Sequence, residues 1–295
     1  MKKASTYIIS VILTLFLIFS IIGTMGLLLV KMRALSAGNC LQLVQSEELP
    51  ERVHQSLEKY YTEQENTSGI PLSAYADSIS TAETEKLIRS TITNAFAYLN
   101  GNAEKLGIEY DFNELKADLT AFFEDYAEKN GYEKDEKYQQ TLQKAIDNAK
   151  NYISSECDVF RFKTLHEAGM IDKAKPFIPW VGYGLIGFCI LDAVLLILLI
   201  ICNRKEKESV WYWLASGVLV SSVLVLVPAI WLSATHWFDK FAVKTDQIFA
   251  AVTGFLYGIT HTAAMIAGAG IVVAFCFFII SMIQHRKQNA RTNGR

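Results

Sequence analysis

The residue of this sequence most able to do chemistry is Asp192, a carboxylic acid inside the apolar stretch GFCILDAVLLILLIIC. A carboxylate in hydrocarbon is costly, so such a residue usually binds a proton or ion, pairs with a cation, or joins helices through a hydrogen bond. Counting about 1.5 Å per residue from Asn203 places Asp192 roughly 16 Å inside a membrane, near the midplane. Asp192 is therefore the first candidate for a functional residue.

The same count from the inner ends of the other apolar runs reaches the hydroxyl residues Thr14, Ser221 and Ser222. A proton relay needs several titratable groups, and no Lys, Arg, His or second acid is expected at this depth, since His261 lies near the opposite surface. We expect a neutral Asp192 hydrogen-bonded to Ser221, Ser222 or Thr14. Two alternatives stay open, namely a Lys or Arg from a partner protein, and ion conduction through an assembly of several copies.

No other residues have the spacing of a catalytic or metal site. The histidines are scattered, and neither HExxH nor CxxC occurs in the sequence. GxSxG and Walker sequences are also lacking. The sequence therefore predicts a protein that is not an enzyme and that binds no metal or cofactor.

Four long apolar runs must position these residues. They cover residues 7–30, 177–202, 210–232 and 256–283. Each exceeds the roughly 20 residues that a helix needs to cross the hydrocarbon core. The first run is longer than the apolar core of a secretory signal, so we interpret it as an uncleaved anchor. These runs predict an all-α integral membrane protein with four transmembrane helices.

Basic residues near the helix ends predict the orientation, because cytoplasmic loops are rich in Lys and Arg. The side with the denser basic set carries Lys2, Lys3, Arg204, Lys205, Lys207, Arg286, Lys287, Arg291 and Arg295. The other side carries fewer, namely Lys31, Arg33, Lys240 and Lys244. We predict a multi-pass plasma-membrane protein with both termini in the cytoplasm and residues 34–175 outside.

The chain divides into three parts by composition. Residues 1–33 form a short cytoplasmic N-terminus and the first span, and residues 34–175 form a polar extracytoplasmic domain. Residues 176–295 hold three spans, a short cytoplasmic turn, an outer interfacial segment and a basic tail. The polar domain has more Asp and Glu than Lys and Arg, which argues against nucleic acid as a partner.

Apolar residues recur at helical spacing throughout the polar domain, and no alternating strand pattern occurs. Ser80 and Glu83 make a capping box that predicts the start of one helix, while Gly101 and Gly131 predict helix ends. We expect four or five helices with a core of their own. The aromatic residues are expected in that core, with a ligand pocket among them as the alternative.

Cys40 and Cys157 lie near the two ends of the polar domain. A disulfide between them would close a long loop and stabilise the domain by roughly 4–5 kcal/mol in the chain-entropy model. The alternative is a pair of free buried thiols. Cys189, Cys202 and Cys276 fall in the apolar runs and are expected to behave as small hydrophobic residues.

The fourth run contains small residues at four-residue spacing, which lets helices approach closely. Gly254 and Gly258 form one such pair, and Gly268 and Gly270 follow. This pattern is compatible with packing of the fourth helix within the bundle and with packing against a partner or a second copy. Before this run, residues 236–249 have helical spacing of aromatic residues and predict a short helix on the outer interface or under the polar domain.

These observations favour a non-enzymatic membrane protein whose acidic helical domain binds an extracellular ligand or partner. It would act as a sensor, an adaptor or an accessory subunit, in contact with the lipid bilayer and with a membrane-protein partner or a second copy. The alternative is a transporter or channel component that uses Asp192. The two differ in whether ions cross the membrane.

Overall fold

A computed structural model describes residues 2–106, 112–204 and 207–293. In this part of the chain 85% of the residues are helical and no strand is present. The all-α prediction is therefore confirmed for the described residues. Lys205 and Arg295, two of the basic residues used for the orientation, lie outside them.

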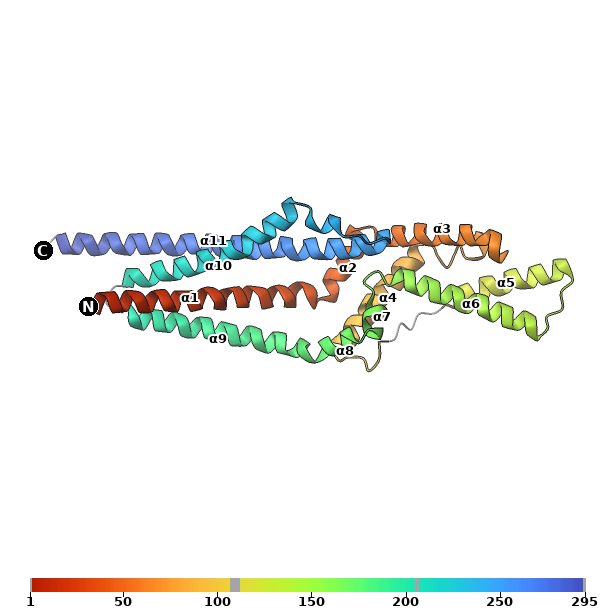
Figure 1. Cartoon of the computed structure of the whole chain (residues 1–295), viewed down its shortest axis with the longest axis horizontal. Helices are drawn as coiled ribbons and strands as arrows, with labels where there is room; N and C mark the ends of the chain where they lie inside the picture. Colours follow the sequence, from red (N-terminus) through yellow and green to blue (C-terminus); the bar gives the residue numbers. More distant parts are fainter. Residues whose placement is uncertain (1, 107–111, 205–206, 294–295) are drawn as a thin grey trace. The chain divides into compact units, whose positions relative to one another are not determined.

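The helical segments follow one another with short connections. In chain order they are α1 (Lys2–Leu29), the π-helical turn η1 (Val30–Ala34), α2 (Ala37–Ser46), α3 (Leu49–Ser68), η2 (Leu72–Ala74), α4 (Thr81–Leu99), α5 (Asn113–Asn130), α6 (Glu136–Cys157), α7 (Phe162–Glu167), α8 (Met170–Ala174), η3 (Lys175–Phe177), α9 (Ile178–Cys202), α10 (Lys207–Ala234), η4 (Trp237–Lys240) and α11 (Asp246–Asn293). Figure 1 shows their course along the chain.

Four helical stretches are long and apolar enough to cross a membrane. They are Thr6–Ala34, Met170–Cys202, Ser209–Ala234 and Asp246–Lys287. Each contains one of the four apolar runs of the sequence, so the prediction of four such helices is confirmed. The chain is a multi-pass membrane protein by this criterion.

The contacts divide the chain into two compact units. The first, called here the membrane unit, comprises the residues up to 35, residues 177–240 and those from 256 onward. The second, called the helical domain, comprises residues 36–176 together with residues 241–255. The contacts place residues 241–255 in the helical domain, whereas the predicted division groups them with the last three spans. Helix α11 thus supplies residues to both units.

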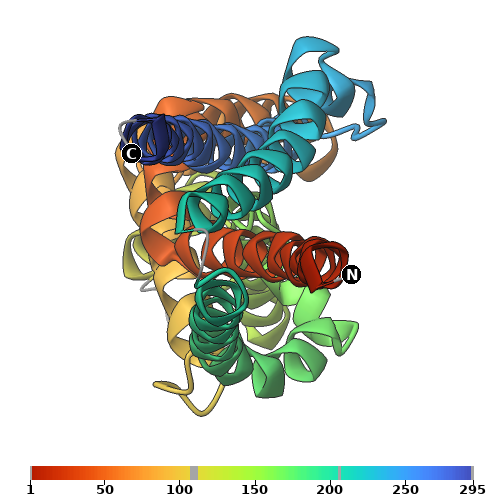
Figure 2. The same cartoon turned by 90° about the vertical axis from the view of Figure 1, so that its left-hand side faces the viewer.

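In the membrane unit, α1 packs against α9 and α10, and Figure 2 shows it flanked by these two helices. Leu17 of α1 is buried with Leu195 and Leu199 of α9. At Gly23 the absence of a side chain lets the Phe188 ring approach α1, because a Cβ there would lie 2.5 Å from that ring. Apolar contacts and this close approach hold α1 and α9 together.

The core of the helical domain is formed mainly by α3, α4, α5 and α6. Its largest fully buried side chains include Leu57, Ile88 and Ile146. Ser80 caps α4 by accepting a hydrogen bond from the Glu83 amide at 3.4 Å, as the capping box predicts. Gly131 ends α5 in the left-handed region, with φ of +68°, where glycine has no steric penalty. Helices α5 and α6 then pair as a hairpin (Figure 1).

The predicted helix over residues 236–249 is not formed as one element. Trp237–Lys240 make the single turn η4, the chain from 241 to 245 is not helical, and α11 begins at Asp246. In the membrane unit, Asp239 accepts a hydrogen bond from the Tyr257 hydroxyl at 2.8 Å. The aromatic residues whose spacing suggests a helix make ring contacts instead, such as that of Phe238 with Tyr257.

Candidate functional site

Asp192 is hydrogen-bonded to a neighbouring helix. The Thr24 hydroxyl on α1 donates to Asp192 Oδ2 at 2.8 Å. The other carboxyl oxygen, Oδ1, is buried and has no hydrogen-bond partner among the described residues. One side of the carboxyl therefore joins α1 to α9, and the other makes no hydrogen bond within the described part of the chain.

The partner of Asp192 is Thr24 and none of the three predicted residues, Thr14, Ser221 and Ser222. On α1, the predicted depth assumes the wrong register. That count aligns Asn203 with Lys3, whereas in the structure the Asn203 amide donates to Ser10 Oγ at 2.9 Å. The residue of α1 level with Asn203 is therefore residue 10 and not residue 3, which shifts α1 along α9 by roughly 10 Å relative to the prediction. Side chains also lean toward the N-terminus of their own helix, so Thr24 and Asp192 on antiparallel helices lean toward each other.

The three predicted hydroxyl partners lie elsewhere. Thr14 Oγ1 donates to the Ser10 carbonyl at 2.8 Å, and Ser221 Oγ donates to the Val218 carbonyl at 3.0 Å, both within their own helices. Ser222 Oγ is buried without a partner among the described residues. The structure therefore does not bring Thr14, Ser221 and Ser222 together with Asp192 into the predicted hydrogen-bonded cluster.

Close packing is found at only some of the predicted glycines. A Cβ at Gly270 would overlap Ser222 Oγ and lie 3.3 Å from the Met25 methyl group, so α11 approaches α10 and α1 at this point. A Cβ at Gly258 or Gly268 would meet nothing within 4 Å. Packing within the bundle thus occurs at Gly270, while Gly258 and Gly268 make no such contact within this chain and their packing against a partner stays a prediction.

Cys40 and Cys157 are free thiols in the structure rather than a disulfide. Both are buried in the core of the helical domain, with exposed fractions of 2% and 0%. Burial raises the pKa of Cys40 to about 12, and it raises that of Cys157 well above its usual range. The two thiols pack as small hydrophobic groups, which is the alternative left open by the sequence.

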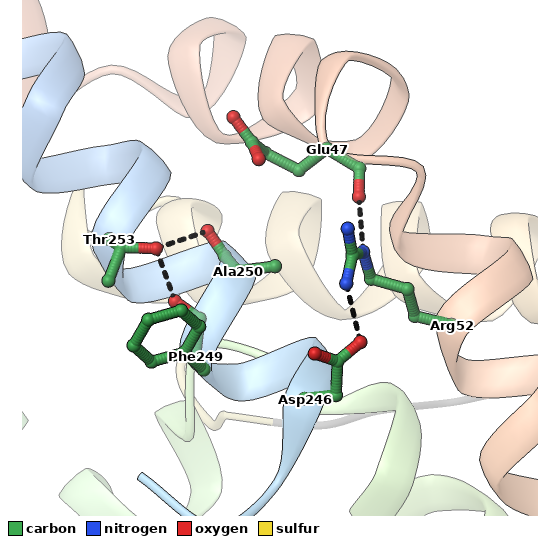
Figure 3. A network of polar contacts seen from close by, with 6 residues as sticks. All are labelled: Glu47, Arg52, Asp246, Phe249, Ala250 and Thr253. Atoms are coloured by element: carbon green, nitrogen blue, oxygen red, sulfur yellow. Dashed lines mark hydrogen bonds and ion pairs between the residues drawn. The ribbon is translucent and has the colours of Figure 1, made fainter. Parts of the chain in front are cut away.

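The first turn of α11 is fastened to α3 by a charged pair. Arg52 Nη1 lies 2.5 Å from Asp246 Oδ2, and Arg52 Nε donates to the Glu47 carbonyl at 2.9 Å (Figure 3). Asp246 occupies the first turn of α11, where a negative charge is favourable because of the helix dipole. One arginine therefore joins the end of α2 to the beginning of α11 within the helical domain.

A second, buried contact lies one residue further along α11. Gln247, only 2% exposed, donates through Nε2 to Glu156 Oε2 of α6 at 2.5 Å. Ser56 of α3 donates to the same oxygen at 3.3 Å. Ala250 and Ala251 then enter the apolar core of the domain. The beginning of α11 is thus an internal part of the helical domain.

Sequence reasoning found only part of this arrangement. It predicts one short helix over residues 236–249, on the outer interface or under the polar domain, and it names no partner for Asp246 or Gln247. A further signal is Gly254, whose lack of a side chain leaves room for the Glu47 side chain, since a Cβ would lie 2.9 Å from Glu47 Oε1. That signal points to a close contact without naming its partner.

Metal-binding geometry is not found in the described part of the chain. No group of three or more His, Cys, Asp or Glu side chains there is placed to hold a metal ion. His54 Nδ1 contacts the Ile79 carbonyl at 2.6 Å, and His236 Nδ1 lies 3.2 Å from Asp239 Oδ2. These contacts hold local structure together.

No protein-family model, curated protein or solved structure matches this chain. Its functional interpretation therefore depends on two structural features. One is the intramembrane contact of Asp192 with Thr24, and the other is the insertion of the start of α11 into the helical domain.

Proposed function

We propose that the chain is a non-enzymatic plasma-membrane protein with both termini in the cytoplasm and the helical domain outside. In this proposal the helical domain binds an extracellular ligand or partner. The chain then acts as a sensor, an adaptor or an accessory subunit of a membrane complex.

The observation that supports this proposal most strongly is the shared use of α11. Its first turns contribute Gln247, Ala250 and Ala251 to the interior of the helical domain, and the same helix continues as an apolar stretch long enough to cross a membrane. Binding that alters the packing of α3 or α6 would change the contacts of α11 directly. A sensor needs a connection of this kind, because a ligand acts only through differential contacts with two states.

Cysteine labelling tests the orientation. A membrane-impermeant maleimide should label Lys129→Cys in the helical domain of intact cells, and should label Lys287→Cys near the C-terminus only after permeabilisation. Both native side chains are exposed. The unsubstituted chain is the control for labelling of the native cysteines, of which Cys40 and Cys157 are buried and Cys189 and Cys276 are exposed within apolar helices. The reverse labelling pattern would overturn the proposed orientation.

Site-specific photocrosslinking in native membranes tests for a partner of the helical domain. A photoreactive residue replaces Tyr126 or Tyr132, which are 49% and 62% exposed on that domain. Tyr212, 50% exposed in the membrane unit, is the matched control position. A partner captured from the first two positions and not from Tyr212 supports the proposal. Absence of any crosslinked macromolecule from the domain counts against a protein partner and leaves a small ligand to be tested as described below.

A second candidate function is transport or conduction through Asp192. The buried, unpartnered Oδ1 among the described residues favours it. The purified protein in liposomes should then carry protons or cations, and Asp192→Asn should abolish the flux. Liposomes without flux at any tested pH would remove this candidate.

A further inference from the structure

The helical domain contains an open pocket walled by tyrosines. It has a volume of about 310 Å³, which is near the lower end of the range typical of small-molecule sites. Tyr60 and Tyr61 of α3, Tyr75 after η2, and Tyr152 of α6 line it. All four belong to the helical domain, so the pocket lies inside one unit.

The tyrosine rings hold one another in place. Tyr60 stacks on Tyr152 with ring centroids 3.6 Å apart and an interplanar angle of 20°. Tyr61 stacks on Tyr75 at 3.9 Å and 19°, and also meets Tyr152 edge to face. Interlocked rings lose little further freedom when a ligand binds, so the wall is pre-organised for a flat molecule.

The hydroxyl of Tyr61 is a buried polar group with no partner among the described residues. The side chain is only 4% exposed and belongs to the pocket wall. Burial raises the pKa of Tyr61 well above its usual range, so the phenol remains a neutral donor at physiological pH. A buried hydroxyl of this kind usually has a hydrogen-bond acceptor nearby, and a ligand at this wall is one source of it.

Among the described residues, Lys144 of α6 is the only charged one that lines the pocket. Its side chain is exposed and makes no ion pair with the described residues. The remaining polar lining is uncharged and includes Gln64 and Asn148. A single unpaired ammonium group beside an aromatic wall favours an anionic ligand and disfavours a cation, although the surrounding domain is acidic overall.

We propose that this pocket binds a small, flat aromatic carboxylate, with its ring on the tyrosine wall and its carboxylate toward Lys144. This inference rests on the proposed function, since it specifies the extracellular ligand of the helical domain. The ring of the ligand buries apolar surface against the tyrosine rings and stacks on them, and its carboxylate pairs with the Lys144 ammonium at the rim.

Calorimetric titration of the full-length protein in nanodiscs tests the proposal with three matched probes. They are 2-naphthoate, its neutral analogue 2-naphthamide, and the cation benzyltrimethylammonium. We expect 2-naphthoate to bind about 3- to 10-fold more tightly than the amide, as a partly exposed ion pair would provide, and we expect no binding of the cation. Tighter binding of the cation, or binding of none of the probes, would overturn the proposal.

Two substitutions locate the binding site. Lys144→Gln should weaken 2-naphthoate about 3- to 10-fold and leave the amide unchanged. Lys137→Gln, also exposed on α6 and outside the pocket lining, is the control and should change neither affinity. Tyr152→Leu should weaken both aromatic probes, with circular dichroism establishing that the variant is folded. Equal effects of Lys144→Gln and Lys137→Gln would show that the probes bind elsewhere.

Hydrogen exchange separates failure of this inference from failure of the proposed function. If 2-naphthoate binds and slows exchange in residues 246–255 as well as in α3 and α6, both are supported. Binding without any change in residues 246–255 would retain the pocket and contradict signalling through α11. Failure of binding would remove the pocket, while the labelling and crosslinking results would still decide the proposed function.

Discussion

Thr24 and Asp192 form a direct hydrogen bond between two apolar helices, with 2.8 Å between Thr24 Oγ1 and Asp192 Oδ2. A polar contact of this kind in lipid contributes modestly to helix association, because the separated helices also find polar partners. Its main effect is on register, since only one sliding position of α1 on α9 brings the two side chains together.

Replacing Thr24 by valine should therefore weaken the α1–α9 contact by about 0.5–2 kcal/mol. Valine has nearly the same shape but cannot donate to Asp192. The measurement is an SDS unfolding titration in mixed micelles, followed by circular dichroism. Thr14→Val is the matched control, because the Thr14 hydroxyl bonds only within α1. Equal losses of unfolding free energy in Thr24→Val and Thr14→Val would contradict a specific role for the hydrogen bond of Thr24.

Asp192→Asn should keep the contact with Thr24, because the amide oxygen still accepts a hydrogen bond. Asp192→Leu should lose it and destabilise the bundle by an amount similar to that for Thr24→Val. The loss of unfolding free energy in the double variant, Asp192→Leu with Thr24→Val, should then be smaller than the sum of the losses in the two single variants. Strict additivity in the same titration would show that the two side chains do not interact.

Gln247→Ala should destabilise the helical domain by about 1–3 kcal/mol, because it leaves a partly buried Glu156 oxygen with fewer donors. Hydrogen exchange of residues 246–255 is the appropriate measurement, since a chain of two units need not unfold in one step. Gln55→Ala, at an exposed position of α3, is the control. Unchanged protection in Gln247→Ala would show that apolar contacts alone hold the start of α11.

Gly270→Ala and Gly268→Ala should differ although they are two residues apart on α11. A Cβ at residue 270 would overlap Ser222 Oγ, and we expect a cost of about 1–3 kcal/mol from overpacking. A Cβ at residue 268 meets nothing within 4 Å, so this variant should be neutral or slightly more stable. Thermal unfolding in detergent compares the two, and the opposite order would contradict the α10–α11 packing.

Alkaline pH should destabilise the helical domain. The pKa of Cys40 is raised from 9.0 to about 12, and those of Tyr75 and Tyr152 from 10.0 to about 12, with burial as the largest cause. A raised pKa means that folding favours the protonated form. The corresponding stability is complete below the unfolded pKa and is lost as the pH rises through the folded one.

The free energy of unfolding should consequently fall between about pH 9 and pH 12. Tyrosinate absorbance and hydrogen exchange, recorded on the same samples, provide the test. Tyr75 should ionise only as the domain unfolds, because burial raises its pKa to about 12. Ionisation of every tyrosine near pH 10 without loss of protection would contradict the buried tyrosine cluster.

Much of the fold follows from local patterns in the sequence. The four apolar stretches are determined by composition and length alone, because a helix satisfies its own backbone hydrogen bonds and needs only enough apolar residues to span the hydrocarbon. Ser80 predicts the start of α4 and Gly131 the end of α5, because capping involves only the adjacent turn of the helix. These features require no knowledge of distant residues.

The contacts of the candidate sites depend on tertiary packing. The choice of Thr24 over Thr14 depends on how α1 slides along α9, and counting from the helix ends does not specify that register. Cys40 and Cys157 share one core, yet only their packing decides whether the thiols bond. The insertion of Gln247 beside Glu156 depends on side chains ninety-one positions apart meeting in the folded domain. Sequence periodicity shows which face of a helix is buried, whereas the identity of its partner is decided by three-dimensional shape.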